Sequence, residues 1–428
     1  MMHIDIPGEI PVRRLGRTRS GDLLLGGMIL VGLLALVVTF LSDPDRARQA
    51  YVSNWLFFYS IAQGAVIFAA ITTIVKARWN WSVRRVSLGF AAFLPIAFVL
   101  FLPMLTLGES YFPWIEQMAY DPIVQKKAAY LNLPFLMTRS VVGLLALIGL
   151  SLYFTRLMVR PDVGLVGDDG DPRLKGWKDR LTQNWLGQEA EEVRSWKTIR
   201  KLAPALILVY AAVMSFLIFD YAMSLEPHWF STLFGAWFFM GALWGGIAAT
   251  ALATVWLKGQ HADFDRFMGL QQLHDLGKLT FAFSIFWTYL FFSQYIVIWY
   301  GKLPWEQAWV IHRSVEPWST LSLLVLFLCF IVPFAALLGK TPKTTPAILG
   351  VVTAIIMVGL WLERYLLVVP SLRPEGPVMG LAEPLIALFF LGLFLGSLRW
   401  FFTTFPVIQV WQPMADAELM EAETAFAD

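Results

Sequence analysis

Acidic and imidazole side chains lie in a short stretch of the sequence that joins two apolar runs. The stretch FDYAMSLEPHWFS contains Asp220, Glu226 and His228. A connection of about five residues makes neighbouring helices antiparallel, so these side chains are expected together at one membrane surface. A carboxylate or imidazole there can accept a proton from a hydroxyl group as electrons leave it. Ion pairs that hold helix ends in place would use the same residue types.

Further ionisable residues are predicted at the same level. Arg139 opens one apolar run, and Glu363 with Arg364 lies near the end of another. Gln294 and Tyr295 approach this level from a third run. Charged side chains at membrane depth are costly and are functional hypotheses by default. Two interpretations follow: a salt-bridge layer, or a quinol pocket or proton exit.

A second polar cluster is predicted on the opposite side of the membrane. The stretch LHDLGKLTF contains His274, Asp275 and Lys278. His274 and Lys278 are four residues apart and share one helical face. One interpretation is a helix-start cap at Asp275 with a lysine that reaches toward the membrane surface. The other is the mouth of a proton half-channel.

The histidine and cysteine content argues against a redox centre bound by this chain. A single cysteine, Cys329, excludes an internal disulfide, a covalent haem attachment motif and a cysteine-ligated cluster. Of the five histidines, only His228 and His312 could face each other at one depth, and both lie in connections. We therefore expect no metal, haem or iron–sulfur cluster in this chain.

The elements that position these residues are apolar helices. The chain has 428 residues, of which 57% are hydrophobic, whereas soluble domains contain about 45–50% apolar residues. We therefore expect an all-α polytopic membrane protein with about ten transmembrane helices. The apolar windows place the helices near residues 22–41, 54–75, 86–107, 135–156, 204–223, 229–256, 276–299, 317–338, 345–367 and 382–402.

Charge and composition divide the chain further. Basic residues concentrate on the side of the N-terminus, which predicts that both termini are cytoplasmic. We expect a cytoplasmic N-terminal segment at 1–21, a transmembrane domain at 22–402 with a polar cytoplasmic loop at 157–203, and an acidic cytoplasmic tail at 403–428. The net charge of +2 gives no indication of nucleic-acid binding.

Two segments of the chain show a weak internal repeat. FFYSIAQGAVIFAAI, from Phe57, resembles FFMGALWGGIAATAL, from Phe238, with Gly64 aligned to Gly245. The offset predicts two parallel four-helix bundles with flanking helices, although chance similarity between apolar stretches gives the same pattern. Gly241 and Gly245 also form a G-x-x-x-G face that permits close helix packing.

Three segments carry a resemblance to a known family: YLNLPFLMTRS, FDYAMSLEPHWFSTLFGAWFFMGALWGG and LHDLGKLTFAFSIFWTYLFFSQYIVIWYGKLPWE. They resemble the second large membrane subunit of alternative complex III, within the polysulfide-reductase-type membrane anchors. The resemblance extends from about Trp55 to Pro370. It implies two four-helix bundles with flanking helices, in a bacterial inner membrane.

The resemblance also implies a function and partners. Such complexes oxidise quinol, with their haems and iron–sulfur clusters in other subunits. The expected partners are a multihaem cytochrome c, an iron–sulfur subunit, a homologous membrane subunit and a terminal oxidase, besides membrane lipids. This subunit would bind no cofactor other than quinone. The matching site positions are Arg139, Asp220, Glu226, His228, His274, Asp275 and Lys278.

Two alternatives remain open at this point. A stand-alone secondary transporter would carry broken helices and an ionisable site near the middle of the membrane. A purely structural membrane anchor would bind neither quinone nor protons. Because the polar residues are predicted near the two membrane faces, the sequence favours the subunit of a quinol-oxidising complex over the transporter.

Overall fold

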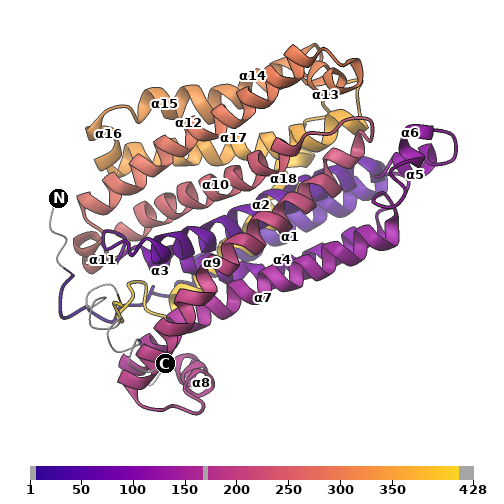
Figure 1. The fold of residues 1–428 in the computed structure, drawn as a ribbon. Coiled ribbons are helices and arrows are strands. Elements are labelled where there is room, and N and C mark those ends of the chain that lie inside the picture. Colours follow the sequence, from indigo (N-terminus) through magenta and orange to yellow (C-terminus); the bar gives the residue numbers. More distant parts are fainter. Residues whose placement is uncertain (1–5, 167–171, 414–428) are drawn as a thin grey trace.

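The computed structural model describes residues 6–166 and 172–413, and in these ranges the chain is helical, with no strand (Figure 1). Ten helical segments are long and apolar enough to cross a membrane, which confirms the predicted architecture. They are α1 (Arg19–Ser42), α2 (Pro44–Ile74), α3 to η2 (Arg84–Thr106), α7 (Leu133–Leu165), α9 to η3 (Gln188–Leu225), α10 (Thr232–Lys258), α12 (Leu270–Gly301), α14 to α15 (Ser319–Ala336), α17 (Pro346–Leu372) and α18 (Ala382–Thr404).

Three of the spanning segments are composite, and short helices occupy the connections. The third span comprises α3 (Arg84–Gly89), η1 (Phe90–Phe93), α4 (Leu94–Phe101) and η2 (Leu102–Thr106). The fifth comprises α9 (Gln188–Tyr221) and η3 (Met223–Leu225), and the eighth comprises α14 (Ser319–Leu326), η4 (Phe327–Ile331) and α15 (Val332–Ala336). The connecting helices are α5 (Trp114–Gln117), α6 (Pro122–Gln125), α8 (Pro172–Leu181), α11 (Ala262–Phe267), α13 (Pro304–Ser314) and α16 (Lys340–Thr344).

Helices α2 and α9 begin well before their predicted starts because polar helical turns precede the apolar windows. At α2, the Asp43 side chain accepts a hydrogen bond from the backbone N–H of Arg46, and Pro44 occupies the first turn. Both features favour the start of a helix. The first part of α9 is charged, so the predicted loop at 157–203 is largely helical in its described part.

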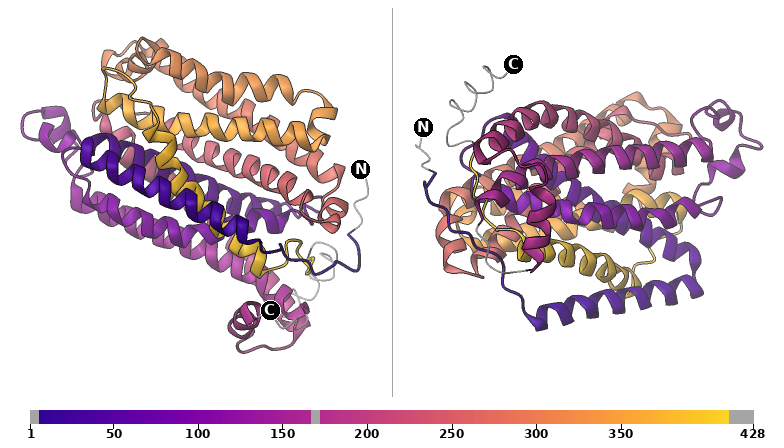
Figure 2. Two further views of the ribbon diagram at one scale, coloured as in Figure 1. Left: turned by 180° about the vertical axis from the view of Figure 1, so that it is seen from behind. Right: turned by 90° about the horizontal axis from the view of Figure 1, so that it is seen from below.

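The spans form two four-helix bundles. One contains α2, α3 to η2, α7 and α9, and the other contains α10, α12, α14 to α15 and α17. Helices α1 and α18 lie side by side against the outside of the first bundle (Figure 2). This arrangement confirms the predicted pair of bundles with flanking helices.

Close contact between α2 and α10 joins the two bundles. A Cβ atom at Gly64 would lie 2.0 Å from the carbonyl oxygen of Ala242, and one at Gly246 would lie 2.2 Å from the nitrogen of Ala65. Only glycine permits such an approach. The predicted close-packing glycine Gly245 also faces α2, where a Cβ atom would lie 2.2 Å from the side chain of Ile61, while its neighbour Gly246 meets the α2 backbone.

Both ends of the described chain meet at one end of the bundles, which we call the chain-end side. The backbone N–H of Leu15 donates to the carbonyl oxygen of Phe402 (2.9 Å), and that of Val407 donates to the carbonyl oxygen of Arg13 (2.9 Å). Helices α5, α6 and α13 lie at the opposite end, the far side (Figure 1).

Part of the predicted acidic tail is buried against the protein. Residues 405–409 and Trp411 are buried, and the backbone N–H groups of Val410 and Trp411 donate to Asp162 Oδ1 (2.6 and 2.5 Å). The other oxygen of Asp162 accepts a hydrogen bond from Arg85 (2.7 Å). The prediction of a tail from residue 403 was therefore wrong for this apolar part, and the acidic residues 414–428 lie outside the described ranges.

Candidate functional site

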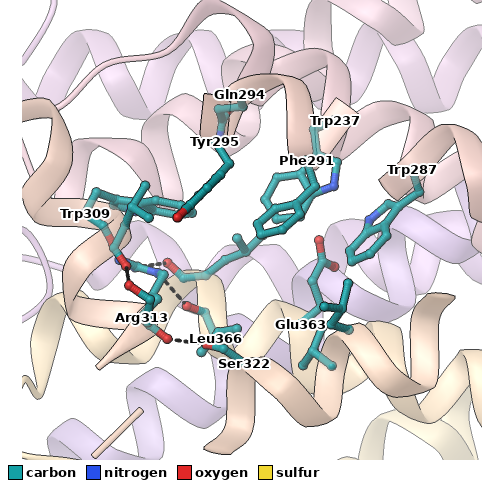
Figure 3. Close-up of a pocket in the computed structure, with 15 residues that line it drawn as sticks. Trp237, Trp287, Phe291, Gln294, Tyr295, Trp309, Arg313, Ser322, Glu363 and Leu366 are labelled. Atoms are coloured by element: carbon teal, nitrogen blue, oxygen red, sulfur yellow. Dashed lines mark hydrogen bonds between the residues drawn. The ribbon is translucent and has the colours of Figure 1, made fainter. Parts of the chain in front are cut away.

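A cavity of about 110 Å³ lies in the second bundle, between α10, α12, α13, α14 and α17 (Figure 3). Aromatic side chains form most of its wall: Trp237, Trp287, Phe291, Tyr295 and Trp309. The residues from α12 recur every three or four positions, so they share one face of that helix. For comparison, an engineered apolar cavity of about 150 Å³ binds benzene. The present cavity has about three quarters of that volume, and its aromatic lining suits the face of a small ring.

Glu363 brings a carboxylate into this aromatic wall. Its side chain is almost completely buried, and Oε2 accepts a hydrogen bond from Arg364 Nη1. Its other oxygen, Oε1, accepts no hydrogen bond of normal geometry from the described residues, although the Trp287 side chain lies close enough to interact with the carboxyl group. In Figure 3 the carboxyl group points toward Trp287 and Phe291. A buried carboxylate oxygen without a partner is costly, so the site favours a ligand or water that donates a hydrogen bond.

Arg364 holds this carboxylate in place. Its side chain is fully buried, and the guanidinium lies 4.3 Å from the centre of the Phe238 ring. The predicted pair Glu363 and Arg364 is therefore an ion pair. It also lies deeper than predicted, because α17 extends to Leu372. Glu363 precedes that end by about 13 Å of helix rise.

Two tryptophans of the cavity wall supply possible donors. The indole N–H groups of Trp237 and Trp287 are buried and make no hydrogen bond among the described residues. Trp287 also packs near Trp237, with ring centroids 5.6 Å apart. A ligand that both donates and accepts hydrogen bonds, such as a hydroxylated or carbonyl-bearing ring, suits this combination of a carboxylate and indole N–H groups.

Arg313 lies in the cavity wall on the far side. Its guanidinium stacks on Trp309, 4.0 Å from the ring centre, and donates to the backbone oxygens of Leu366 (3.0 Å) and Leu367 (3.2 Å). Burial lowers the pKa of Arg313 to about 10, against the opposing effect of the Glu226 carboxylate. The guanidinium thus fixes the end of α13 onto α17.

Sequence reasoning missed Arg313 because it lies in a connecting helix outside every apolar window. The stretch PWEQAWVIHRS offered one signal, since Trp309 and Arg313 are four residues apart and share a helical face. A buried aromatic residue on that face would have indicated an inward-pointing arginine.

Glu226 is brought to the cavity wall, as part of a network with Arg313. Its Oε1 accepts hydrogen bonds from Arg313 Nη1 (3.2 Å) and from the hydroxyl of Ser371 (2.6 Å). The exposed His312 lies 3.8 Å away through Nδ1. Glu226 thus lies between the arginine of the cavity wall and a histidine at the surface.

Arg139 and Asp220 come together as predicted, but in the first bundle. Arg139 donates from Nε to Asp220 Oδ2 (2.8 Å) and from Nη2 to Oδ1 (2.5 Å), while the Tyr130 hydroxyl also donates to Oδ1 (3.0 Å). Burial raises the pKa of Tyr130, so this hydroxyl remains a donor at neutral pH. Both oxygens of Asp220 are therefore engaged.

The two bundles place an arginine in comparable positions. Arg139 lies over Tyr130, 3.9 Å from the ring centre, and binds the end of α9. Arg313 lies over Trp309 and binds the end of α17. Each arginine thus stacks on an aromatic ring and holds the last helix of its bundle. Arg139 pairs with the carboxylate of Asp220 on that helix, whereas Arg313 pairs with Glu226 from the connection after α9 and borders the cavity.

His228 does not join Asp220 or Glu226. Its Nε2 lies 2.5 Å from Asp121 Oδ2, and its side chain is about half exposed. Burial tends to raise the pKa of Asp121, but the backbone N–H of Ile123 and the imidazole of His228 outweigh it, and the pKa is lowered. This pair connects the loop after α9 to the start of α6.

The cluster of His274, Asp275 and Lys278 lies elsewhere on α12. Lys278 Nζ forms an ion pair with Asp275 (2.5 Å), and Gln271 donates to the same carboxylate (2.5 Å). The cap expected at Asp275 is not formed, because α12 begins at Leu270. Asp275 precedes Gln294 of the cavity wall by about 28 Å of helix rise, so the cluster and the cavity are separate.

Buried polar side chains continue from Arg364 toward the chain-end side. Tyr210 is close enough to Arg364 and Tyr59 to interact electrostatically with both. One turn along α2 from Tyr59, Gln63 donates to the Ser151 hydroxyl (2.7 Å). The Tyr59 hydroxyl and Gln63 Oε1 have no partner among the described residues. These groups form a polar series through the middle of the protein.

Metal-ligating side chains do not cluster in the parts of the chain at 6–166 and 172–413: no group of three or more His, Cys, Asp or Glu is placed to hold an ion. Cys329 is buried and packs against Gly359. Comparison with protein-family models and with curated proteins finds no match for this chain, so the family resemblance rests on its own segments.

Proposed function

We propose that this protein is a membrane subunit of a bacterial quinol-oxidising complex of the alternative complex III type, and that its cavity binds the quinol head group. The observation that carries this proposal is Glu363 Oε1, which accepts no hydrogen bond of normal geometry from the described residues and lies in a wall of aromatic rings. A quinol offers a flat ring to the aromatic side chains and a hydroxyl to the carboxylate. The haems and iron–sulfur clusters that accept electrons belong to partner subunits, as the resemblance implies.

The cavity residues have different roles in the proposed oxidation of quinol. A quinol hydroxyl donates its hydrogen bond to Glu363 Oε1, and its proton passes to that oxygen as the ring loses electrons. Complete oxidation to quinone releases two protons and two electrons. Glu363 passes the first proton on before it accepts the second, and the electrons leave to a haem or iron–sulfur cluster of a partner subunit. Arg364 orients the carboxylate through Oε2, and an indole N–H of Trp237 or Trp287 binds the carbonyl oxygen of the quinone.

A second function, proton conduction, is favoured by the polar series that begins at Arg364. Tyr210, Tyr59 and Gln63 lie in order from the cavity toward the chain-end side. The Tyr210 hydroxyl donates to the carbonyl oxygen of Phe239 (2.5 Å), whereas Tyr59 and Gln63 keep a polar atom without a partner among the described residues. Such groups can hold water molecules between them. On the far side, Glu226 and the exposed His312 provide a shorter way to the surface.

Quinone binding tests the proposal directly. The purified complex is titrated with a short-chain quinone while tryptophan fluorescence is measured, because a ring next to Trp287 quenches its emission. Glu363→Gln removes a charge-assisted hydrogen bond of about 1.5–3 kcal/mol, so we expect the dissociation constant to rise about 10- to 150-fold.

A matched control is Glu383→Gln. Glu383 is equally buried and is paired with Arg46 (2.7 Å), but it lies on α18, outside the cavity wall. We expect its quinone affinity to equal that of the wild type. Equal affinity in the wild type and in Glu363→Gln would refute the site. Substrate uptake by the purified chain in liposomes would instead favour a transporter, and the absence of haem and iron–sulfur partners on gentle extraction would refute the assignment to a complex.

A further inference from the structure

The outward face of α12 carries a stripe of large side chains that the described residues leave exposed. Successive members lie three or four residues apart, so they share one face of the helix. The opposite face of α12 packs against α10, where Trp244 Nε1 donates to the carbonyl oxygen of Thr280 (2.9 Å). The α12 stripe, whose members are between 39% and 60% exposed, comprises Ile285, Tyr289, Phe292, Ile296 and Trp299.

The residues at the two ends of the α12 stripe indicate its depth in the membrane. Lys278 precedes the stripe and is half exposed, and Trp299 and Tyr300 at its other end are also exposed. Lysine reaches toward lipid head groups, and tryptophan and tyrosine concentrate at membrane surfaces. About 33 Å of helix rise separates Lys278 from Tyr300, close to the roughly 30 Å of a hydrocarbon core. Tyr289 is equally far from both in sequence, so it lies near the middle of the membrane.

Two hydroxyl groups of this face lack a partner at that depth. The Tyr289 ring packs near Phe286, with centroids 6.1 Å apart, but its hydroxyl makes no hydrogen bond with the described residues. Ser293, one turn along the helix, also makes none within residues 6–166 and 172–413. By contrast, the neighbouring Thr288 hydroxyl donates to the carbonyl oxygen of Ser284 (2.9 Å). Lipid chains contain no acceptor, so a lipid cover would leave both groups unsatisfied.

The shape and chemistry of the α12 stripe define what could cover it. Within the hydrocarbon core, a helix satisfies its own backbone groups and can lie against α12. Large side chains such as Phe292 and Ile296 fit between small residues of a facing helix. The Tyr289 hydroxyl requires an acceptor, which a serine, threonine, asparagine or glutamine side chain supplies. The complementary surface is therefore a spanning helix with a polar residue among small ones.

We propose that the α12 stripe binds a transmembrane helix of another subunit, and that the Tyr289 hydroxyl donates a hydrogen bond to an acceptor side chain of that helix. Ser293 binds a polar group one turn further along the same helix. This inference rests on the assignment of the chain to a membrane complex, but it does not depend on quinol binding in the cavity.

Photo-crosslinking in the full complex identifies what covers the α12 stripe. The photoreactive amino acid p-benzoylphenylalanine takes the place of Tyr289, and crosslinked peptides are mapped by mass spectrometry after illumination in the membrane. We expect crosslinks to one spanning helix of a subunit that copurifies in stoichiometric amount, next to a polar residue of that helix.

Tyr289→Phe then tests the hydrogen bond, because it removes only the hydroxyl group. Dissociation of the crosslinked subunit is measured in vesicles as lipid is added. We expect its dissociation constant to rise about 3- to 18-fold, the range for hydrogen bonds between spanning helices. The matched control is Tyr153→Phe on α7, where the tyrosine is 45% exposed and lies near Arg156. The control should leave the dissociation constant unchanged, and all three proteins should unfold at the same temperature.

Several outcomes would overturn the proposal. Crosslinks to lipid alone in an intact complex would refute this inference and leave the assignment to a complex in place. Crosslinks to a second copy of this chain would show that the partner is not another subunit. Equal dissociation constants for the wild type and Tyr289→Phe would show that the hydroxyl does not bind the partner. Absence of any copurifying subunit would refute both the complex and this inference.

Discussion

Loss of the Asp220 carboxylate tests whether the ion pair in the first bundle is structural. Asp220→Asn leaves Arg139 with a neutral partner in a place where the arginine side chain is 12% exposed and the aspartate 1%. Breaking a buried pair by removing one partner costs about 3–5 kcal/mol, because the remaining charge is uncompensated. Because Arg139 keeps some exposure, part of its charge stays solvated. We therefore take the lower end of this range, about 3 kcal/mol, or about a 150-fold change in the unfolding equilibrium.

A double variant, Arg139→Met with Asp220→Asn, is compared with Asp220→Asn alone. Removing both charges eliminates the uncompensated guanidinium, so the double variant should be more stable than Asp220→Asn alone. Unfolding is followed in mild detergent with increasing denaturant, and quinone binding is measured on the folded fraction. We expect Asp220→Asn to lower the free energy of unfolding and to leave the quinone affinity equal to that of the wild type.

One combination of results would refute this reasoning. If Asp220→Asn unfolds as the wild type does and loses quinone binding, then Asp220 acts in the site and the ion pair is not structural. Glu363→Gln provides the reference for a true loss of quinone binding in the same assay.

Two further perturbations address packing and pH. Gly246→Ala places a Cβ atom 2.2 Å from the nitrogen of Ala65 and should destabilise the protein by about 1–3 kcal/mol or more. The control variant Gly149→Ala, where no atom lies within 4 Å of the added Cβ atom, should leave the stability unchanged. Thermal unfolding of both variants measures this difference, and equal melting temperatures would contradict the α2–α10 contact. The lowered pKa of Asp121 stabilises the fold above the ordinary value of 3.8. That contribution is lost as the pH falls through the folded-state pKa of Asp121. Over this pH range, proteolysis of the α6 loop should increase in the wild type, whereas in Asp121→Asn it should not change with pH.

The spans could be predicted from sequence because membrane crossing requires long apolar windows, which composition reveals. The windows did not reveal the polar turns that precede them in α2 and α9, because hydropathy does not report helix caps such as Asp43. The length of α17 beyond residue 367 was missed for a related reason. Pro370 lies inside the helix, and a proline is normally taken as a helix end. This error placed Glu363 too close to the surface.

The candidate site was predicted in part. Asp220 and Arg139 were grouped correctly, since each lies near the end of a predicted helix and both ends were predicted at the same membrane level. Glu363 was grouped with them, but the residues that contact Glu363 depend on which bundle each helix joins. A single sequence does not show how the helices divide between the bundles. Arg313 was missed because its burial results from contacts with α17, far away in the chain.

The buried carboxylate of Asp162 has a consequence for biogenesis. Among the described residues, its Oδ1 accepts hydrogen bonds from the backbone N–H groups of Val410 and Trp411, which are translated after every spanning helix. A nascent chain that still lacks these residues must leave this carboxylate oxygen, near the end of α7, to water. Insertion of α1 and α18 is then not the last step of maturation. The fold is complete only when the segment that contains Val410 and Trp411 binds to Asp162.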